Sequence, residues 1–142
     1  MTEPFQTVAV DLVGPLPKAK RGVTHILTFV CMATRWPEAV ALRSSTAEEV
    51  AEGLVGIFFK TGIPQVLSDR GTVFVSALGK KLFEVLGIDS VTTAPYRPQG
   101  NGCVERLHGT LKPMLAKAVS EGIDWSVFLP MAQFAIRQVV NR

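Results

Sequence analysis

The chain has 142 residues, of which 47% are hydrophobic and 19% are charged, a composition that excludes an intrinsically disordered chain and predicts a domain with a real core. No apolar run reaches the roughly 20 residues that a membrane-spanning helix needs. The net charge of +3 is compatible with a nucleic-acid partner but does not by itself indicate one.

The sequence predicts a single domain over residues 1–142. It contains no repeat, no low-complexity tract and no Gly/Ser linker, and its first residues do not resemble a secretory signal. Cys31 and Cys103 form neither a metal-binding spacing nor a disulfide framework, which favours a reducing compartment. Because the last segment stays apolar and periodic up to Arg142, we expect a fragment of a longer protein to which Met1 was added.

The first 42 residues predict three strands. Residues 5–12 alternate in polarity, residues 25–32 form a nearly continuous apolar run, and residues 38–42 are short and apolar. The basic turn at 18–22 is so short that the strands on either side of it must be antiparallel. The sheet is therefore expected to begin as an antiparallel meander.

Helices and strands alternate in the remainder of the chain. Ser45 and Thr46 offer an N-cap to the first helix, and Gly62 offers its end. In order, the expected elements are a helix over 46–60, a strand over 65–68, a helix over 76–86, a strand over 89–93, a loop over 94–102, a helix from about 100–102 to 119 and a helix over 124–140. This order predicts an α/β fold with a five-stranded mixed sheet, an antiparallel meander followed by parallel strands, flanked by helices.

Three acidic residues, Asp11, Asp69 and Glu105, stand out by their places in these elements. Asp11 lies in the first strand, Asp69 directly follows the fourth, and Glu105 lies early on a helix, with 35 residues between Asp69 and Glu105. Functional groups collect at strand ends in open α/β sheets. Three clustered carboxylates would bind divalent ions such as Mg²⁺, which points to phosphoryl transfer on a nucleic acid.

The helix that carries Glu105 adds two polar residues to the same face. His108 and Lys112 follow Glu105 at i+3 and i+7. The opposite, core-facing stripe comprises Val104, Leu107, Leu111, Leu115 and Ala118. The loop before the helix holds Tyr96, Arg97, Gln99 and Asn101, whose side chains suit stacking and hydrogen bonding to a nucleic acid. Pro113 predicts a kink near 109–113.

Simpler readings of the same residues stay open at this point. Each acid alone is more often a solvated surface charge, a turn residue or a first-turn helix residue favoured by the helix dipole. His108 can be an ordinary exposed helix histidine, and Trp36 and Trp125 are most simply packing anchors.

Four ordered motifs resemble the catalytic core of retroviral-type integrases, especially those of Ty3/gypsy LTR retrotransposons. They lie at 10–17 (VDLVGPLP), 33–39 (ATRWPEA), 67–74 (LSDRGTVF) and 94–106 (APYRPQGNGCVER). The resemblance covers essentially the whole chain and implies an RNase H-like fold. It also implies that Asp11, Asp69 and Glu105 bind two Mg²⁺ or Mn²⁺ ions and catalyse 3′-end processing and DNA strand transfer.

The resemblance has further implications for partners and surroundings. Tyr96, Gln99 and Asn101 would lie on a mobile active-site loop, and His108 and Lys112 would face the DNA ends. Such cores usually form dimers through helices, act in the nucleus and pass through a cytoplasmic particle stage. The zinc-binding and basic domains of these integrases are not among the 142 residues, so this core is expected to be weakly active.

Two positions depart from the family pattern, and two other functions compete with integration. Met32 stands where an Asp is common, outside the triad, and Gln133 stands where an apolar residue is expected. We interpret Gln133 as a solubilising residue on a partner-facing surface. The competing functions are a domesticated core acting as a nucleic-acid-binding or scaffold module without catalysis, and an RNase H or other nuclease with the same fold.

Overall fold

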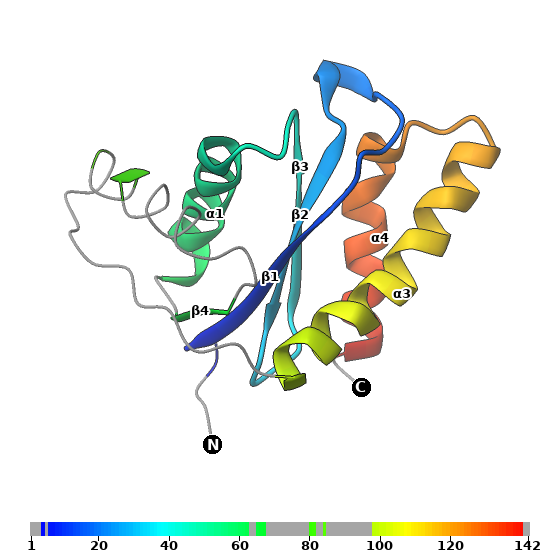
Figure 1. Cartoon of the computed structure of the whole chain (residues 1–142). Helices are drawn as coiled ribbons and strands as arrows, with labels where there is room; N and C mark the ends of the chain where they lie inside the picture. The colour runs from blue at the N-terminus through cyan, green and yellow to red at the C-terminus, as the bar shows by residue number, and fades with distance from the viewer. Residues whose placement is uncertain are drawn as a thin grey trace.

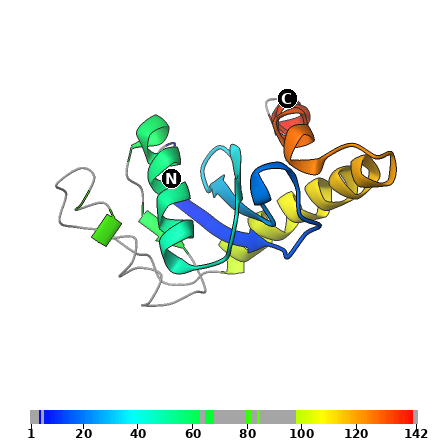
Figure 2. The same cartoon turned by 90° about the horizontal axis from the view of Figure 1, so that it is seen from above.

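A computed structural model of the chain describes residues 4, 6–62, 65–67, 80, 81, 84 and 98–140. The described residues form three layers, with α1 (Ala47–Thr61) on one face of a sheet and α3 (Pro98–Ser120) and α4 (Trp125–Val140) on the other (Figures 1 and 2). Within this part of the chain, no helix is both long and apolar enough to cross a membrane.

The sheet has four described strands in the order β3-β2-β1-β4. Their bounds are β1 Thr7–Val13, β2 His25–Cys31, β3 Pro37–Leu42 and β4 Gln65–Leu67. The first three strands pair antiparallel, whereas β4 pairs parallel to β1, so the predicted meander followed by a parallel strand is confirmed. The predicted fifth strand at 89–93 lies outside the described residues.

Helix α1 begins and ends at the residues that local signals predict. The Thr46 hydroxyl oxygen accepts a hydrogen bond from the Glu49 N–H at 3.3 Å, which is the expected N-cap. The Glu49 carboxylate accepts from the Arg43 N–H at 3.2 Å instead of closing a capping box on Thr46. At the other end Gly62, with φ of 79°, donates its N–H to the Phe58 carbonyl.

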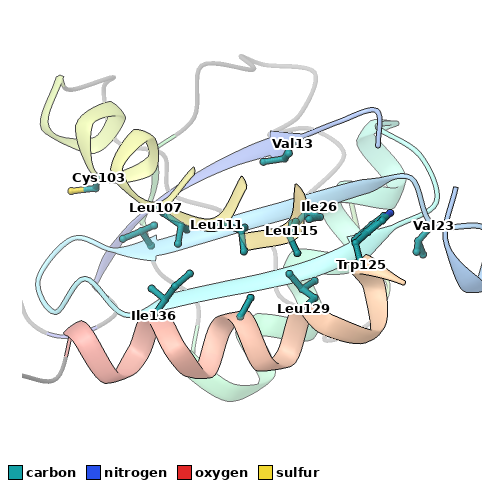
Figure 3. Packing of buried hydrophobic residues seen from close by; sticks show 12 residues of the cluster. Val13, Val23, Ile26, Cys103, Leu107, Leu111, Leu115, Trp125, Leu129 and Ile136 are labelled. Carbon is teal, nitrogen blue, oxygen red and sulfur yellow. The ribbon is translucent and has the colours of Figure 1, made fainter. Parts of the chain in front are cut away.

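Each face of the sheet has its own apolar core. On the α1 side the fully buried residues are Val8, Val10, Leu27, Phe29, Leu42, Val50, Ala51, Leu54, Val55, Ile57 and Phe58. On the other side, Val13, Ile26 and Val30 of the sheet pack against α3 and α4 (Figure 3). The predicted α3 stripe from Val104 to Ala118 is buried as expected. Cys31 and Cys103 are both buried, and neither is part of a disulfide.

Helix α3 starts earlier than predicted, which corrects the expected loop over 94–102. The helix begins at Pro98, so Gln99 and Asn101 lie in its first turn. Proline is favoured at the first helical position, because its missing N–H would have no partner there and its φ is already helical. Pro113 does not interrupt the helix, which continues to Ser120. Of the helix predicted at 76–86, residues 80, 81 and 84 are helical and the others lie outside the described residues.

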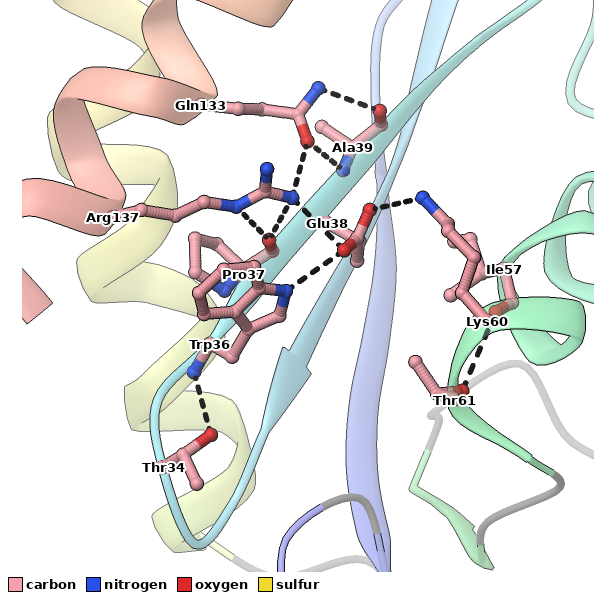
Figure 4. A network of polar contacts seen from close by, with 10 residues as sticks. All are labelled: Thr34, Trp36, Pro37, Glu38, Ala39, Ile57, Lys60, Thr61, Gln133 and Arg137. Atoms are coloured by element: carbon pink, nitrogen blue, oxygen red, sulfur yellow. Dashed lines mark hydrogen bonds and ion pairs between the residues drawn. The ribbon is translucent and has the colours of Figure 1, made fainter. Parts of the chain in front are cut away.

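The edge strand β3 is tied to helices on both faces through Glu38, whose side chain is 8% exposed (Figure 4). Its carboxylate accepts from Lys60 Nζ of α1 at 3.0 Å and from Trp36 Nε1 at 2.8 Å, and lies 2.9 Å from Arg137 Nη2 of α4. The Arg137 guanidinium also lies 4.4 Å from the Trp36 ring centroid. These contacts give the ATRWPEA motif a structural role.

Gln133 belongs to the same network, so its side chain has a role within the chain, and the interpretation that its surface faces a partner stays a prediction. Its carboxamide accepts from the Ala39 N–H at 3.2 Å and donates to the Ala39 carbonyl at 3.0 Å. Both backbone groups lie on the free edge of β3, so the side chain pairs with the edge as a strand would. An apolar residue at this position would leave those two groups without this partner.

Candidate active site

Asp11 is half-buried in the middle of β1, on the face covered by α3 and α4. Its neighbours at alternate positions, Ala9 and Val13, pack with residues of α3, and side chains alternate along a strand. Its carboxylate accepts a hydrogen bond from the Leu12 N–H at 2.8 Å, which limits its rotation. The register of β1 and β2 places Asp11 opposite Thr28.

Helix α3 crosses this face of the sheet and brings three further polar residues to it. Val104 is buried in one cluster with Ala9, which fixes the start of α3 against β1. Glu105 and Lys112 are exposed and His108 is half-buried. The His108 ring reaches the sheet, where its Nε2 lies 2.9 Å from the Thr28 hydroxyl oxygen.

The pKa of His108 is lowered from its usual value of 6.5, mainly because burial disfavours the charged imidazolium. The negative charges of Asp11 and Glu105 raise this pKa, and the positive charge of Lys112 lowers it. Asp11, Glu105 and Lys112 therefore all lie within electrostatic reach of one imidazole ring. Of the nine predicted site residues, these four are the ones that the structure brings together.

The other five predicted site residues are not described by their side chains. Asp69, Tyr96 and Arg97 lie outside the described residues. Gln99 and Asn101 are described by backbone alone, in the first turn of α3 and not in a loop. Both are on the same helix as Glu105 and precede it by six and four residues.

Thr28 is the site residue that sequence reasoning missed. It lies within the apolar run at 25–32 and is fully buried, so the run as a whole predicts a packing residue at this position. Only the strand register, which places it opposite Asp11, and its contact with His108 reveal a polar role. A polar residue in an otherwise apolar central strand was the one available signal.

The donor chemistry of this site suits a hard divalent cation. Asp11 and Glu105 present carboxylate oxygens, the ligands that Mg²⁺ prefers. The Asp11 carboxylate is oriented by the Leu12 N–H, and a metal-binding carboxylate is commonly oriented in this way. These two residues fit the metal that the resemblance implies.

Comparisons with known proteins identify the family of this chain. The family described as Integrase core domain matches residues 1–98. The Gag-Pol polyprotein of Feline leukemia virus is 37% identical over 120 residues, covering 82% of this chain and 7% of that polyprotein. The Pol polyprotein of Radiation murine leukemia virus (strain Kaplan) is 38% identical over 120 residues, covering 82% of this chain and 21% of that polyprotein. The chain thus spans a small part of the curated relatives it matches.

A solved structure has the same fold over most of the chain. The catalytic core domain of BIV integrase superposes with a TM-score of 0.68 at 26% sequence identity, covering 91% of this chain and 81% of that one. The α/β arrangement described above is therefore the RNase H-like fold of integrase cores. The chain belongs to the integrase core domain family and is a retroviral-type integrase catalytic core.

Proposed function

We propose that this core catalyses 3′-end processing and DNA strand transfer, with Asp11, Asp69 and Glu105 as catalytic residues that hold two Mg²⁺ or Mn²⁺ ions. The observation that carries this proposal is that Asp11 of β1 and Glu105 of α3 both act electrostatically on the ring of His108. When bound, such ions activate a water or a 3′-hydroxyl and stabilise the leaving oxygen.

The pairing of β1 with β4 supports the inclusion of Asp69. Ala9 is the register partner of Leu67, the last residue of β4, and the two strands are parallel. Asp11 and Asp69 each follow that pair by two residues along the chain. Two residues span at most about 7 Å, and neighbouring strands lie about 4.8 Å apart, so the two carboxylates can reach one metal.

We further propose that α3 lies along the DNA, which comprises the retroelement ends and the target. Lys112 is exposed two helical turns from Glu105 and offers an ammonium to a phosphate. Gln99 and Asn101 lie on the other side of Glu105 along the helix, so DNA contacts on both sides would centre the scissile phosphate on the acids. Tyr96 and Arg97, which directly precede α3, complete the proposed contacts.

Three wider proposals concern self-association, localisation and the longer protein to which this domain belongs. Cores of this chain are proposed to form a homodimer through α4, which exposes Val127, Met131 and Phe134 along one stripe. As the sequence resemblance implies, we propose that the protein acts in the nucleus after a cytoplasmic particle stage. We also propose that the chain is a single catalytic domain within a longer integrase of the Ty3/gypsy type.

Cleavage and rejoining of a branched DNA substrate tests the catalytic proposal. Asp11→Asn, Asp69→Asn and Glu105→Gln are each expected to lower the Mg²⁺-dependent rate by at least about 100-fold, because metal ligands supply several kcal/mol to such reactions. Glu121→Gln, at an exposed acid that directly follows α3, is the matched control. Unchanged activity in Asp69→Asn would reject the triad.

The same assay separates the competing functions. Cleavage of RNA–DNA hybrids in place of branched DNA would identify a nuclease with this fold. A core that gains no thermal stability from Mg²⁺ and has no activity would instead fit a domesticated scaffold.

A further inference from the structure

The Thr28 side chain joins two parts of the site through one hydroxyl group. Thr28 is 0% exposed, so water has no access to replace either of its contacts. Its hydroxyl donates to the Asp11 carbonyl at 3.1 Å, and its oxygen lies 2.9 Å from His108 Nε2. These contacts link the backbone of Asp11 to the His108 ring, on which both Asp11 and Glu105 act electrostatically.

We propose that Thr28 is a positioning residue that holds Asp11 and His108 together and fixes His108 as the Nε2–H tautomer, leaving Nδ1 as a hydrogen-bond acceptor. The part of this inference that concerns catalysis rests on the proposed function of Asp11. The part that concerns the tautomer rests on hydrogen-bond geometry alone.

Proton counting assigns the tautomer. A carbonyl oxygen can only accept, so the single hydroxyl proton of Thr28 must point to the Asp11 carbonyl. The hydroxyl oxygen can then only accept from His108, which requires the proton to be on Nε2. In a neutral ring Nδ1 then carries a lone pair.

The second histidine of the chain provides a natural comparison with the opposite outcome. The Thr24 hydroxyl donates to the Arg43 carbonyl at 3.0 Å and lies 2.9 Å from His25 Nδ1. By the same counting, His25 carries its proton on Nδ1. One protein therefore holds two threonine–histidine pairs that fix opposite tautomers.

The assigned tautomer determines what His108 can bind in the site. A neutral ring with a free Nδ1 accepts a hydrogen bond, so it suits a hydroxyl, such as a water or a 3′-hydroxyl, rather than a phosphate oxygen. Burial, which lowers the pKa of His108, favours this neutral form. Of His108 and Lys112, only Lys112, further along α3, is then suited to bind a phosphate.

Long-range ¹H–¹⁵N spectra of the labelled core test the tautomer directly. In the wild-type core at neutral pH or above, His108 is expected to show a protonated Nε2 and an unprotonated Nδ1, and His25 the reverse pattern. A His25→Gln variant assigns the two sets of signals. A wild-type His108 protonated on Nδ1 would overturn the inference, and this measurement requires no variant of Thr28.

Two variants of Thr28 test its positioning role. Thr28→Val keeps the shape but removes the hydroxyl, so the His108 signals are expected to shift toward a mixture of tautomers. Thr28→Ser restores the wild-type pattern. Thr24→Val is the matched control, since it is expected to change the signals of His25 alone. An unchanged His108 pattern in folded Thr28→Val would contradict the proposal.

Kinetics on branched DNA test the catalytic consequence. Thr28→Val is expected to lower kcat by about 10- to 100-fold with little change in KM, as the loss of a residue that orients a metal ligand does, and Thr28→Ser to recover most of kcat. A folded Thr28→Val with unchanged kcat would reject the positioning role. If Asp11→Asn kept full activity, the proposed function would fail while the tautomer result would stand.

Discussion

Among the described residues, Glu38 is the charged residue that is buried. The side chains of its two cationic partners differ greatly in exposed fraction. The Lys60 side chain is 64% exposed, whereas that of Arg137 is 25% exposed and stacks on Trp36. Solvent screens an ion pair with an exposed partner, so most of the stabilisation is expected from Arg137 and Trp36. Neither the position of Glu38 in the sequence nor its motif predicts that its side chain is buried.

Removing the two cations separately tests which of them stabilises the buried Glu38 carboxylate more. Arg137→Met is expected to lower the free energy of unfolding by about 1–3 kcal/mol, because it leaves the buried carboxylate short of a charged partner. Lys60→Met is expected to lower it by less than about 1 kcal/mol. Urea denaturation of both variants provides the comparison, and an equal loss in the two would contradict the assignment.

His108 gives the stability of the fold a defined pH dependence. Since its pKa is lowered from 6.5 in the folded chain, the unfolded chain binds this proton more tightly. The contribution of His108 to the stability of the folded state is therefore fully present above the unfolded pKa and is lost as the pH falls from 6.5 through the folded pKa. Between about pH 7.5 and about pH 5, the wild-type core should lose more stability than His108→Asn. Identical losses, measured by urea denaturation without divalent ions, would show that His108 is not buried in this way.

At the scale of elements, α1 carries two glycines in its interior that face different surroundings. A Cβ at Gly53 would lie 3.1 Å from Cδ2 of Leu27 and 3.1 Å from Cδ2 of Leu42, both buried residues of the sheet. A Cβ at Gly56 would meet nothing within 4 Å. Gly53 therefore permits the close approach of α1 to the sheet.

Alanine at each glycine tests this packing. Gly56→Ala is expected to stabilise the protein by about 0.5–1 kcal/mol, the usual gain of alanine over glycine inside a helix. Gly53→Ala is expected to gain less than Gly56→Ala, because the two leucines must shift to admit the methyl group. Thermal unfolding of the pair measures the difference, and an equal gain at both positions would contradict the close approach.

The elements also show what local sequence signals can and cannot predict. The Thr46 cap and the Gly62 end of α1 involve neighbouring residues, and both are confirmed. The start of α3 at Pro98 was missed because Gly100 and Gly102, which are poor helix formers, favoured a loop. The pairing of Asp11 with Thr28 depends on strand register, which joins residues distant in sequence and so could not be derived locally.

At the scale of the whole molecule, α4 covers the sheet with one face and exposes an apolar stripe on the other. Val127, Met131 and Phe134 are 56%, 65% and 65% exposed and recur at helical spacing. A dimer through this stripe would bury these side chains and leave the Asp11 and Glu105 site, formed by β1 and α3, accessible to DNA.

Sedimentation of stripe variants tests the dimer. Met131→Asp and Phe134→Lys are expected to shift the core from dimer to monomer, because a charge would be buried at the interface. Lys117→Glu, on the exposed face of α3, is the control and should leave the distribution unchanged. A wild-type core that sediments as a monomer at every concentration would reject the dimer.

The site as a whole combines what the sequence predicted with what only the fold supplies. The three acids and the α3 face were found from spacing, motif and helical periodicity. Packing between distant segments produces the partial burial of His108, its contact with Thr28 and the pairing of Gln133 with β3. Such contacts have no local signature, because each joins residues more than 75 positions apart.

Crystals of the core soaked in Mn²⁺ provide the most direct test of the catalytic account. Anomalous scattering is expected to place manganese on the Asp11 carboxylate, shared with Asp69 and Glu105, with two ions about 3.5–4 Å apart once DNA is bound. Manganese that is absent from Asp11 at saturating concentration, or that binds only elsewhere on the surface, would contradict the account.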